Sequence, residues 1–220
     1  MKRQEVSALI KTIGILPSVR VNAQELAFFA AQTVYDAGIP IVEITLTVPG
    51  ALEVVSELAK RYPDMAIGTG TVLDEESAHK CIDAGARFLT SPGYVPEVVA
   101  YARKIDVVVF PGALTPTEVI AAWKAGSDFV KIFPTGQVGG SQYLRALKVP
   151  LPQIPLIATG GVNQVNASDF VLAGATAIGV GGEILPKEAL HFRQVDRIHE
   201  LVGRFLTMVR DARALRETYY

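Results

Sequence analysis

The chain has 220 residues, half of them hydrophobic, with 21 basic and 22 acidic side chains. It is therefore long enough for one substantial core, and its near-zero net charge gives no electrostatic basis for binding nucleic acid or an anionic membrane surface. No segment approaches the roughly 18 uncharged apolar residues of a membrane span, the N-terminus lacks the apolar core of a signal peptide, and the single cysteine, Cys81, excludes an internal disulfide.

Eight short β-rich runs alternate with amphipathic, helix-like runs along the chain. The expected strands are 13–19, 39–46, 65–71, 88–91, 107–110, 129–133, 156–159 and 177–180. The expected helices are one N-terminal helix, then 24–37, 51–61, 75–84, 117–125 and 165–173, and a final helix between 192 and 220. Several of these helices end at an Ala-Gly pair, because glycine adopts the left-handed C-cap conformation at little energetic cost.

Eight strand–helix units in a chain of this length favour a closed parallel barrel. An open doubly wound sheet is the competing architecture, and it ordinarily carries a glycine-rich dinucleotide loop after its first strand. Here the first strand instead ends in Pro17-Ser18-Val19-Arg20. We therefore predict an α/β fold of the (β/α)8 TIM-barrel type, one domain over residues 1–220, in a cytoplasmic protein with no nucleic-acid or membrane partner.

Two charged side chains fall on the interior faces of predicted strands. Period-two alternation places Glu43 on one face of the second strand, and Lys131 between Phe129 and Phe133 on one face of the sixth. The centre of such a barrel is a packed core, where an unpaired charge is strongly disfavoured. A functional role is one explanation, and a buried ion pair between Lys131 and Glu43 is the other.

A lysine between two aromatic residues suits one kind of covalent chemistry. Desolvation disfavours an ammonium relative to a neutral amine, which is the form that attacks a ketone. The resulting iminium withdraws electrons from the adjacent carbon, so that a carbon–carbon bond there breaks or forms without a metal. Such chemistry needs a proton shuttle, and the buried carboxylate of Glu43 is the natural candidate.

Glycine pairs follow the last two predicted strands. Gly160-Gly161 comes after Thr159, and Gly181-Gly182 comes after the eighth strand. Backbone N–H groups at these two strand ends form the usual phosphate site of such barrels, although tight turns also need glycine. Glu183 does not fit this prediction, because its carboxylate would repel a bound dianion.

Arg20, at the end of the first strand, would bind a substrate carboxylate through two parallel hydrogen bonds, unless it is an ordinary surface arginine. The three histidines, His79, His191 and His199, are scattered over helical segments without metal-ligand spacing. We therefore expect no metal and no cofactor.

Seven motifs occur in order along the chain, and together they resemble one family. They are VEITLTVP at 42–49, GTGTV at 68–72, SPG at 91–93, FPG at 110–112, TPTE at 115–118, KIFP at 131–134 and TGGVN at 159–163. This arrangement resembles the 2-keto-3-deoxy-6-phosphogluconate (KDPG) / 4-hydroxy-2-oxoglutarate (KHG) aldolases over about residues 13–185.

The resemblance implies a homotrimeric class I aldolase that acts on a small 2-keto acid, releasing pyruvate and glyceraldehyde 3-phosphate or, from KHG, glyoxylate. It implies that Lys131 is the Schiff-base lysine and Glu43 the general acid/base. The positions that it assigns to substrate binding are Thr71, Pro92 and Phe133 around the pyruvyl group and Gly160, Gly161, Gly181 and Gly182 around the phosphate. Thr45, Thr47 and Thr159 are expected to line the same pocket.

Two positions depart from the pattern of that family. Thr47 stands where some members have a carboxylate-binding arginine, and Arg20 matches the arginine that other members carry at the end of strand 1. Gly182 stands where relatives usually have Ser or Thr, whose hydroxyl donates to phosphate. Three alternatives therefore stay open: an aldolase for another 2-keto-3-deoxy sugar acid, such as the 6-phosphogalactonate epimer, a phosphate-binding barrel isomerase or epimerase, and a binding protein without activity.

Overall fold

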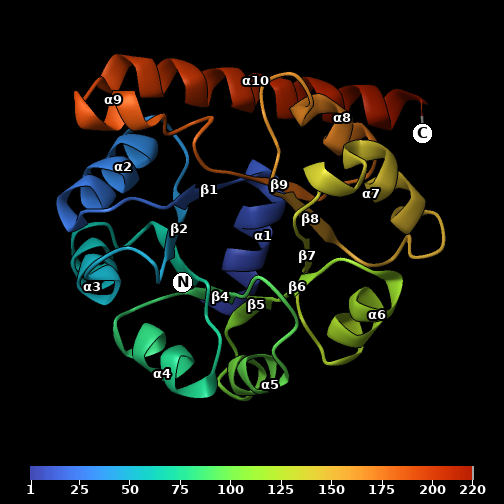
Figure 1. Ribbon diagram of the computed structural model, residues 1–220, viewed down its shortest axis with the longest axis horizontal. Coiled ribbons are helices and arrows are strands. Elements are labelled where there is room, and N and C mark those ends of the chain that lie inside the picture. Colours follow the sequence, from blue (N-terminus) through green and yellow to red (C-terminus); the bar gives the residue numbers. More distant parts are fainter. Residues whose placement is uncertain (220) are drawn as a thin grey trace.

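The computed structural model describes residues 1–219, in which helices surround a barrel of parallel strands (Figure 1). The strands are β1 (Ile15–Val19), β2 (Ile41–Thr45), β3 (Ala66–Gly70), β4 (Phe88–Thr90), β5 (Val108–Phe110), β6 (Gly112–Ala113), β7 (Val130–Ile132), β8 (Leu156–Thr159) and β9 (Ala177–Val180). The helices are α1 (Arg3–Ile13), α2 (Gln24–Asp36), α3 (Ala51–Arg61), α4 (Glu75–Asp83), α5 (Pro96–Lys104), α6 (Pro116–Lys124), α7 (Gly140–Lys148), α8 (Ala167–Leu172), α9 (Lys187–His191) and α10 (Val195–Tyr219), with a 3-10 turn, η1, at Gly136–Val138. The strand order is β5-β4-β3-β2-β1-β9-β8-β7-β6.

The fifth strand of the barrel is divided into β5 and β6 by Pro111. The first part pairs with β4 and the second with β7. Proline has no backbone N–H to donate, so the hydrogen-bond ladder is interrupted there. Backbone hydrogen bonds from Asp128 N to Val109 O (2.9 Å) and from Lys131 N to Pro111 O (3.0 Å) join the two ends of the sheet. All eight predicted strands are present, and the predicted barrel is confirmed.

The structure differs from the predicted elements in four places. Ile13 ends α1 rather than beginning a strand, because Gly14 takes a left-handed conformation (φ 71°) that terminates the helix. Helices α5, α7 and the five-residue α9 were not predicted. The first two can be explained from their residues. Proline at the first turn of α5 and buried Leu144 and Leu147 on one face of α7 account for them.

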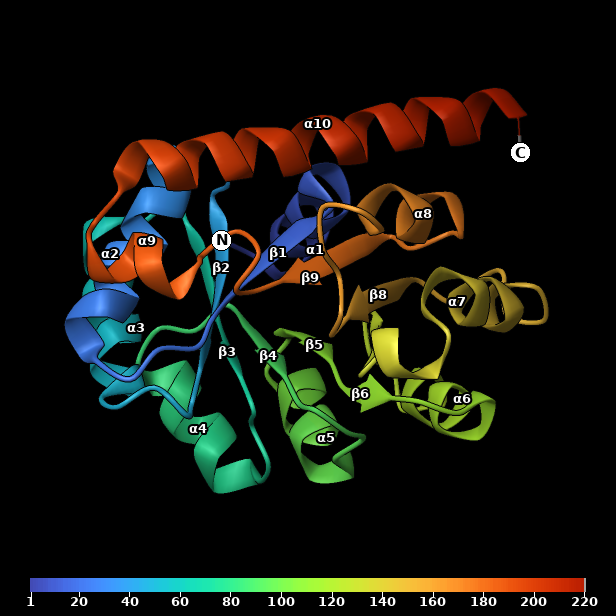
Figure 2. The same ribbon diagram turned by 45° about the horizontal axis from the view of Figure 1, so that its top comes forward.

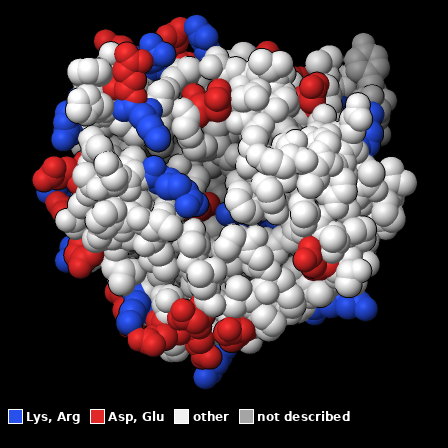
Figure 3. All heavy atoms as spheres, viewed as in Figure 1, with Lys and Arg blue, Asp and Glu red and all other residues white. Residues whose placement is uncertain are grey.

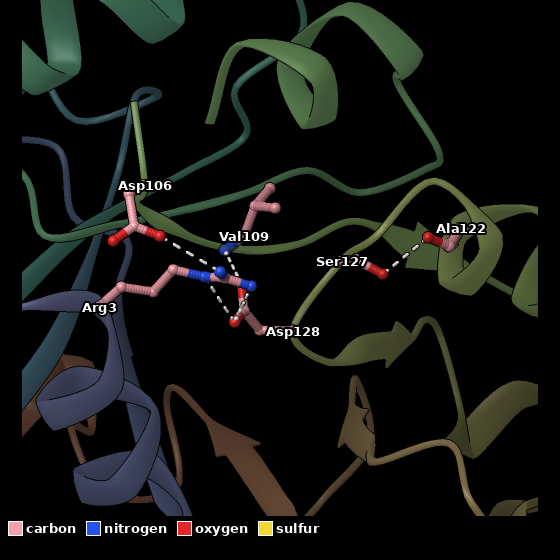
Figure 4. Close-up of polar contacts among 6 residues, drawn as sticks. All are labelled: Arg3, Asp106, Val109, Ala122, Ser127 and Asp128. Atoms are coloured by element: carbon pink, nitrogen blue, oxygen red, sulfur yellow. Dashed lines mark hydrogen bonds and ion pairs between the residues drawn. The ribbon is translucent and has the colours of Figure 1, made fainter. Parts of the chain in front are cut away.

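Helix α1 covers the amino end of the barrel. Its Arg3 forms ion pairs with Asp128 (2.8 Å) and Asp106 (3.3 Å), which precede β7 and β5 (Figure 4). The second oxygen of Asp128 accepts a hydrogen bond from the backbone N of Val109 (3.0 Å). Within the barrel, the ring of Phe110 packs against two other phenylalanine rings, at centroid distances of 5.3 and 6.1 Å. The amino end is thus closed, which leaves the carboxyl ends of the strands for a site.

The C-terminal helix α10 runs along one side of the barrel. It packs against α8 and α2, and α9 lies next to its beginning (Figure 2). Its buried apolar side chains include Ile198, Val202, Phe205 and Val209, which are spaced three or four residues apart. None of the helices within residues 1–219 combines the length and the apolar content of a membrane span.

Candidate active site

A pocket of about 480 Å³ lies at the carboxyl ends of β1, β8 and β9. Figure 3 views the molecule from the side opposite α1 and shows a hollow at the centre of this face, with basic side chains (blue) beside it. Seven of the predicted site residues line the pocket: Arg20, Phe133, Thr159, Gly160, Gly161, Gly181 and Gly182. Closure of the barrel therefore brings the end of the first strand next to the ends of the last two.

Lys131 and Glu43 are both buried in the barrel, with 7% and 2% of their surface exposed. No ion pair joins them, and no hydrogen bond among residues 1–219 uses Lys131 Nζ. The buried ion pair considered above therefore does not form. Lys131 Nζ lies 5.5 Å from the centroid of the Phe133 ring; Phe133 lines the pocket, whereas Lys131 is not among the lining residues. Its nitrogen is thus left available to a ligand.

The Glu43 carboxylate is held by the two strands that flank β2. Ser18 of β1, its register partner, donates a hydrogen bond from Oγ to Glu43 Oε1 (3.2 Å). On β3, Gly70 leaves the space that this carboxylate occupies. Ser18 also lines the pocket, so its hydroxyl connects the buried carboxylate to the pocket wall.

Thr45 and Thr47 lie outside the lining of this pocket and bond to each other. The Thr45 hydroxyl donates to Val19 O (3.1 Å) and lies 2.9 Å from the Thr47 hydroxyl, which ties β2 to the end of β1. Thr45 is fully buried and Thr47 is exposed. Each hydroxyl thus has a protein partner, and the substrate-binding role of the two threonines stays a prediction.

Thr71 and Pro92 also lie outside the residues that line the pocket. Thr71 follows β3 in a left-handed conformation (φ 64°), which is rare for a β-branched residue and occurs most often at functional sites. The carbonyl of Pro92 lies so close to Gly112 that a Cβ on Gly112 would clash with it. Thr71 follows β3, which pairs directly with the strand that carries Glu43, and Pro92 follows β4, the next strand along. Their contacts with a substrate stay predictions.

A buried threonine connects the loop after β7 to the end of β8. The hydroxyl of Thr135 donates to Thr159 O (2.7 Å) and accepts from Thr159 N (3.0 Å), and Gly136 N donates to Gly160 O (2.8 Å). Gly160 and Gly161 have φ values of 83° and 84°, which favour glycine. These contacts hold the predicted anion-binding turn next to the strand that carries Lys131.

The Thr159 hydroxyl is buried and has no hydrogen-bond partner among residues 1–219. Leaving such a group unpaired costs roughly 1–3 kcal/mol, and native structures usually supply a partner. The hydroxyl lies against Gly179 of β9 with almost no solvent-accessible surface, so contact between Thr159 and a substrate stays a prediction.

Three polar residues of the pocket were not among the predicted site residues: Ser18, Glu183 and Lys187. Ser18 could have been predicted from the sequence, because it lies two residues before Arg20 on the same face of the strand. Lys187 begins α9, a five-residue helix that the periodicity does not reveal. Its side chain brings a positive charge to the same pocket as Glu183.

No group of three or more potential metal ligands from His, Cys, Asp and Glu occurs in the described part of the chain. Cys81 is buried on α4, and burial raises the pKa of its thiol. This cysteine is part of the helix packing rather than of the pocket.

Known proteins resemble this chain in sequence over most of its length and in fold. The family model of KDPG and KHG aldolases matches residues 6–201. The 2-dehydro-3-deoxy-phosphogluconate aldolase of Pseudomonas aeruginosa is 31% identical over 209 residues, which cover 93% of this chain and 94% of that protein. The KHG/KDPG aldolase of Escherichia coli is 30% identical over 204 residues, covering 91% and 95%.

A solved structure of a related enzyme has the same fold. KDPG aldolase from Legionella pneumophila, crystallised with pyruvate captured at low pH as a covalent carbinolamine intermediate, is 30% identical with a TM-score of 0.83. The match covers 89% of this chain and 95% of that one. Because the family model spans most of the chain and full-length relatives reach 30% identity, this chain belongs to the KDPG and KHG aldolase family of carbon–carbon lyases.

Proposed function

We propose that this chain is a class I aldolase that reversibly cleaves KDPG to pyruvate and glyceraldehyde 3-phosphate, KHG to pyruvate and glyoxylate, or both. The observation that carries the proposal is Lys131, a buried lysine on a barrel strand whose amine has no protein partner among the described residues. The covalent carbinolamine that pyruvate forms in the Legionella relative supports the same chemistry.

In the first stage, the neutral amine of Lys131 adds to the C2 ketone of the substrate. The carbinolamine loses water and becomes an iminium, which binds the substrate covalently and draws electrons from C3. No metal or organic cofactor enters this sequence of steps. The carboxylate of the substrate remains next to the iminium and needs a cationic partner, for which we propose Arg20, at the pocket wall.

In the second stage, Glu43 takes the proton of the C4 hydroxyl. The C3–C4 bond breaks, the aldehyde leaves, and the bonding electrons move toward the iminium nitrogen to give an enamine. Glu43 then returns the proton to C3, and water hydrolyses the pyruvyl iminium. A carboxylate that first accepts and then donates one proton is sufficient for both transfers.

The far end of the pocket decides which aldehyde is accepted. Backbone groups of Gly160, Gly161 and Gly181 support an anionic group there. Glu183 disfavours a phosphate dianion at the same wall, and Lys187 partly compensates for that charge. Weaker phosphate binding would favour KHG over KDPG, and an aldolase for another 2-keto-3-deoxy sugar acid, such as the 6-phosphogalactonate epimer, stays the alternative.

Association as a homotrimer and a cytoplasmic location stay predictions from the sequence. Size-exclusion chromatography with light scattering measures the first directly. A monomeric mass at micromolar concentration would contradict the trimer and leave the proposed chemistry untouched.

The decisive experiment is borohydride trapping with pyruvate, followed by intact-mass measurement and peptide mapping. We expect one reduced pyruvyl adduct on Lys131 in the wild type and none in Lys131→Met. Lys124→Met, which removes an exposed lysine at the end of α6, is the matched control and should be trapped normally. A wild-type protein without an adduct, or an adduct in Lys131→Met, would exclude the proposal.

A coupled lactate dehydrogenase assay then compares pyruvate release from KDPG, its galactonate epimer and KHG. Release from any of them supports an aldolase. Absence of release from all three, together with absence of trapping, would favour the isomerase or the binding protein instead.

A further inference from the structure

Ser18 lies between the pocket and the buried carboxylate of Glu43. It is half-buried near the end of β1 and lines the pocket, whereas Glu43 is almost completely buried and does not line it. The two residues are register partners on adjacent strands, so their side chains project side by side into the barrel. The Ser18 hydroxyl lies 3.2 Å from Glu43 Oε1 and donates to it.

The same carboxylate oxygen is confined from the opposite strand. A Cβ on Gly70 of β3 would meet Glu43 Oε1 before any other atom, so this oxygen fills the space that the glycine leaves. Ser18 is the one group among residues 1–219 that donates a hydrogen bond to the carboxylate. Oε1 is therefore held on both sides, and Oε2 has no protein partner within the described chain.

We propose that Ser18 is a positioning residue for proton transfer, which holds Glu43 Oε1 so that Oε2 exchanges the proton with the substrate. The inference rests on the proposed role of Glu43 as general acid/base. Efficient proton transfer requires the carboxylate to lie within hydrogen-bond reach of the reacting atom in a suitable orientation. A carboxylate on a flexible side chain satisfies this requirement more often when one of its oxygens is tied to the barrel wall.

The hydroxyl, rather than the volume of Ser18, is the group that matters. Ser18→Thr and Ser18→Val have side chains of the same shape and differ only in the presence of the hydroxyl. Both variants add the same methyl group relative to serine, so any effect of its bulk is common to the two. The pair therefore separates hydrogen bonding from packing.

The test measures two steps on each variant. Deuterium uptake into the methyl group of pyruvate in D2O reports proton transfer, and borohydride trapping reports Schiff-base formation at Lys131. We expect the exchange rate of Ser18→Val to be about 10-fold below that of Ser18→Thr, which is part of the ~10²–10⁴-fold that general acid–base catalysis supplies. Trapping and the KM for pyruvate should be the same in the two variants.

Equal exchange rates in Ser18→Thr and Ser18→Val would overturn the inference, whether both are fast or both are slow. Should Ser18→Val fail to fold, Ser18→Ala takes its place in the same comparison. As a further requirement, Ser18→Val should have no additional effect in a Glu43→Gln background, because Ser18 acts through that carboxylate. A further loss of exchange rate when Ser18→Val is added to Glu43→Gln would also contradict the role of Ser18.

The Glu43→Gln variant and trapping at Lys131 together separate this inference from the proposed function. Normal exchange in Glu43→Gln contradicts the role proposed for Glu43 and with it the role of Ser18, whereas absence of trapping at Lys131 contradicts the proposed function itself. Slow exchange in Glu43→Gln, combined with equal rates in Ser18→Thr and Ser18→Val, contradicts only the role of Ser18.

Discussion

Gly70 has no room for a side chain, because the carboxylate of Glu43 occupies the position that its Cβ would take. The two residues lie on adjacent strands, β3 and β2, and both are buried. Glycine at the end of β3 is thus required by the Glu43 side chain on the neighbouring strand and not by a turn, since its φ is not in the left-handed range.

The first prediction concerns Gly70→Ala. The added methyl group must displace Glu43, so we expect deuterium exchange into pyruvate to fall by about 10²-fold, within the range that general acid–base catalysis contributes. Borohydride trapping at Lys131 should persist. Gly203→Ala on the exposed side of α10 is the control: it should keep the activity and raise the free energy of unfolding by about 0.5–1 kcal/mol. Wild-type exchange in Gly70→Ala would be incompatible with this arrangement.

The second prediction concerns the left-handed backbone at Thr71. A β-branched residue in this conformation costs on the order of 1–3 kcal/mol, so we expect Thr71→Gly to raise the free energy of unfolding by roughly 1 kcal/mol. If the threonine contacts the pyruvyl group, as the family resemblance implies, Thr71→Gly should also raise the KM for pyruvate. Thr71→Ser, which keeps the hydroxyl, should have a KM close to that of the wild type. Urea denaturation and steady-state kinetics measure the two effects. A Thr71→Gly variant that is less stable than the wild type would contradict backbone strain at this position.

The third prediction concerns the far end of the pocket. A Cβ on Gly182 meets no atom within 4 Å, so serine is accommodated there without strain. Gly182→Ser adds a hydroxyl donor, and a hydrogen bond to a charged group is worth about 1.5–3 kcal/mol. We therefore expect the ratio of kcat/KM for KDPG to that for KHG to rise by about 10-fold. Glu183→Gln should move the ratio in the same direction, and an unchanged ratio in both variants would show that phosphate binds elsewhere.

The fourth prediction is a pH dependence of stability at the start of α6. Hydrogen bonds from the backbone N–H groups of Thr115 (2.7 Å) and Leu114 (2.8 Å) lower the pKa of Glu118 from its usual value. A carboxylate whose pKa is lower in the folded state stabilises the fold above its unfolded pKa, and this contribution is lost as the pH falls through the folded pKa. The stability difference between the wild type and Glu118→Gln should therefore be largest near neutral pH and shrink in acid. Chemical denaturation at several pH values measures it, and a difference that grows in acid would have the wrong sign.

The division of the fifth strand at Pro111 shows a limit of local patterns. The sequence predicts a strand there and a proline after it, but a proline is compatible with the end of a strand or with an interruption. Only the pairing of Gly112 and Ala113 with β7 shows that the strand resumes. The short helix α9 was missed for a related reason, since five residues carry too little periodicity, and Lys187 was missed with it.

The sequence by itself determined the alternation of strands and helices, the interior faces that carry Glu43 and Lys131, and the ordered motifs of the family. These features are local, because the alternation of side chains along a strand depends only on backbone geometry. The sequence also located the glycine turns after the last two strands, which the structure places in one pocket with Arg20.

Only the tertiary structure decided which of these groups touch. Lys131 and Glu43 could have formed an ion pair, and they do not, whereas the hydroxyls of Thr45 and Thr47 lie within hydrogen-bond distance of each other. The hydrogen bond from Ser18 to Glu43 depends on the register between β1 and β2. That register is set by closure of the whole barrel and cannot be read from either strand alone.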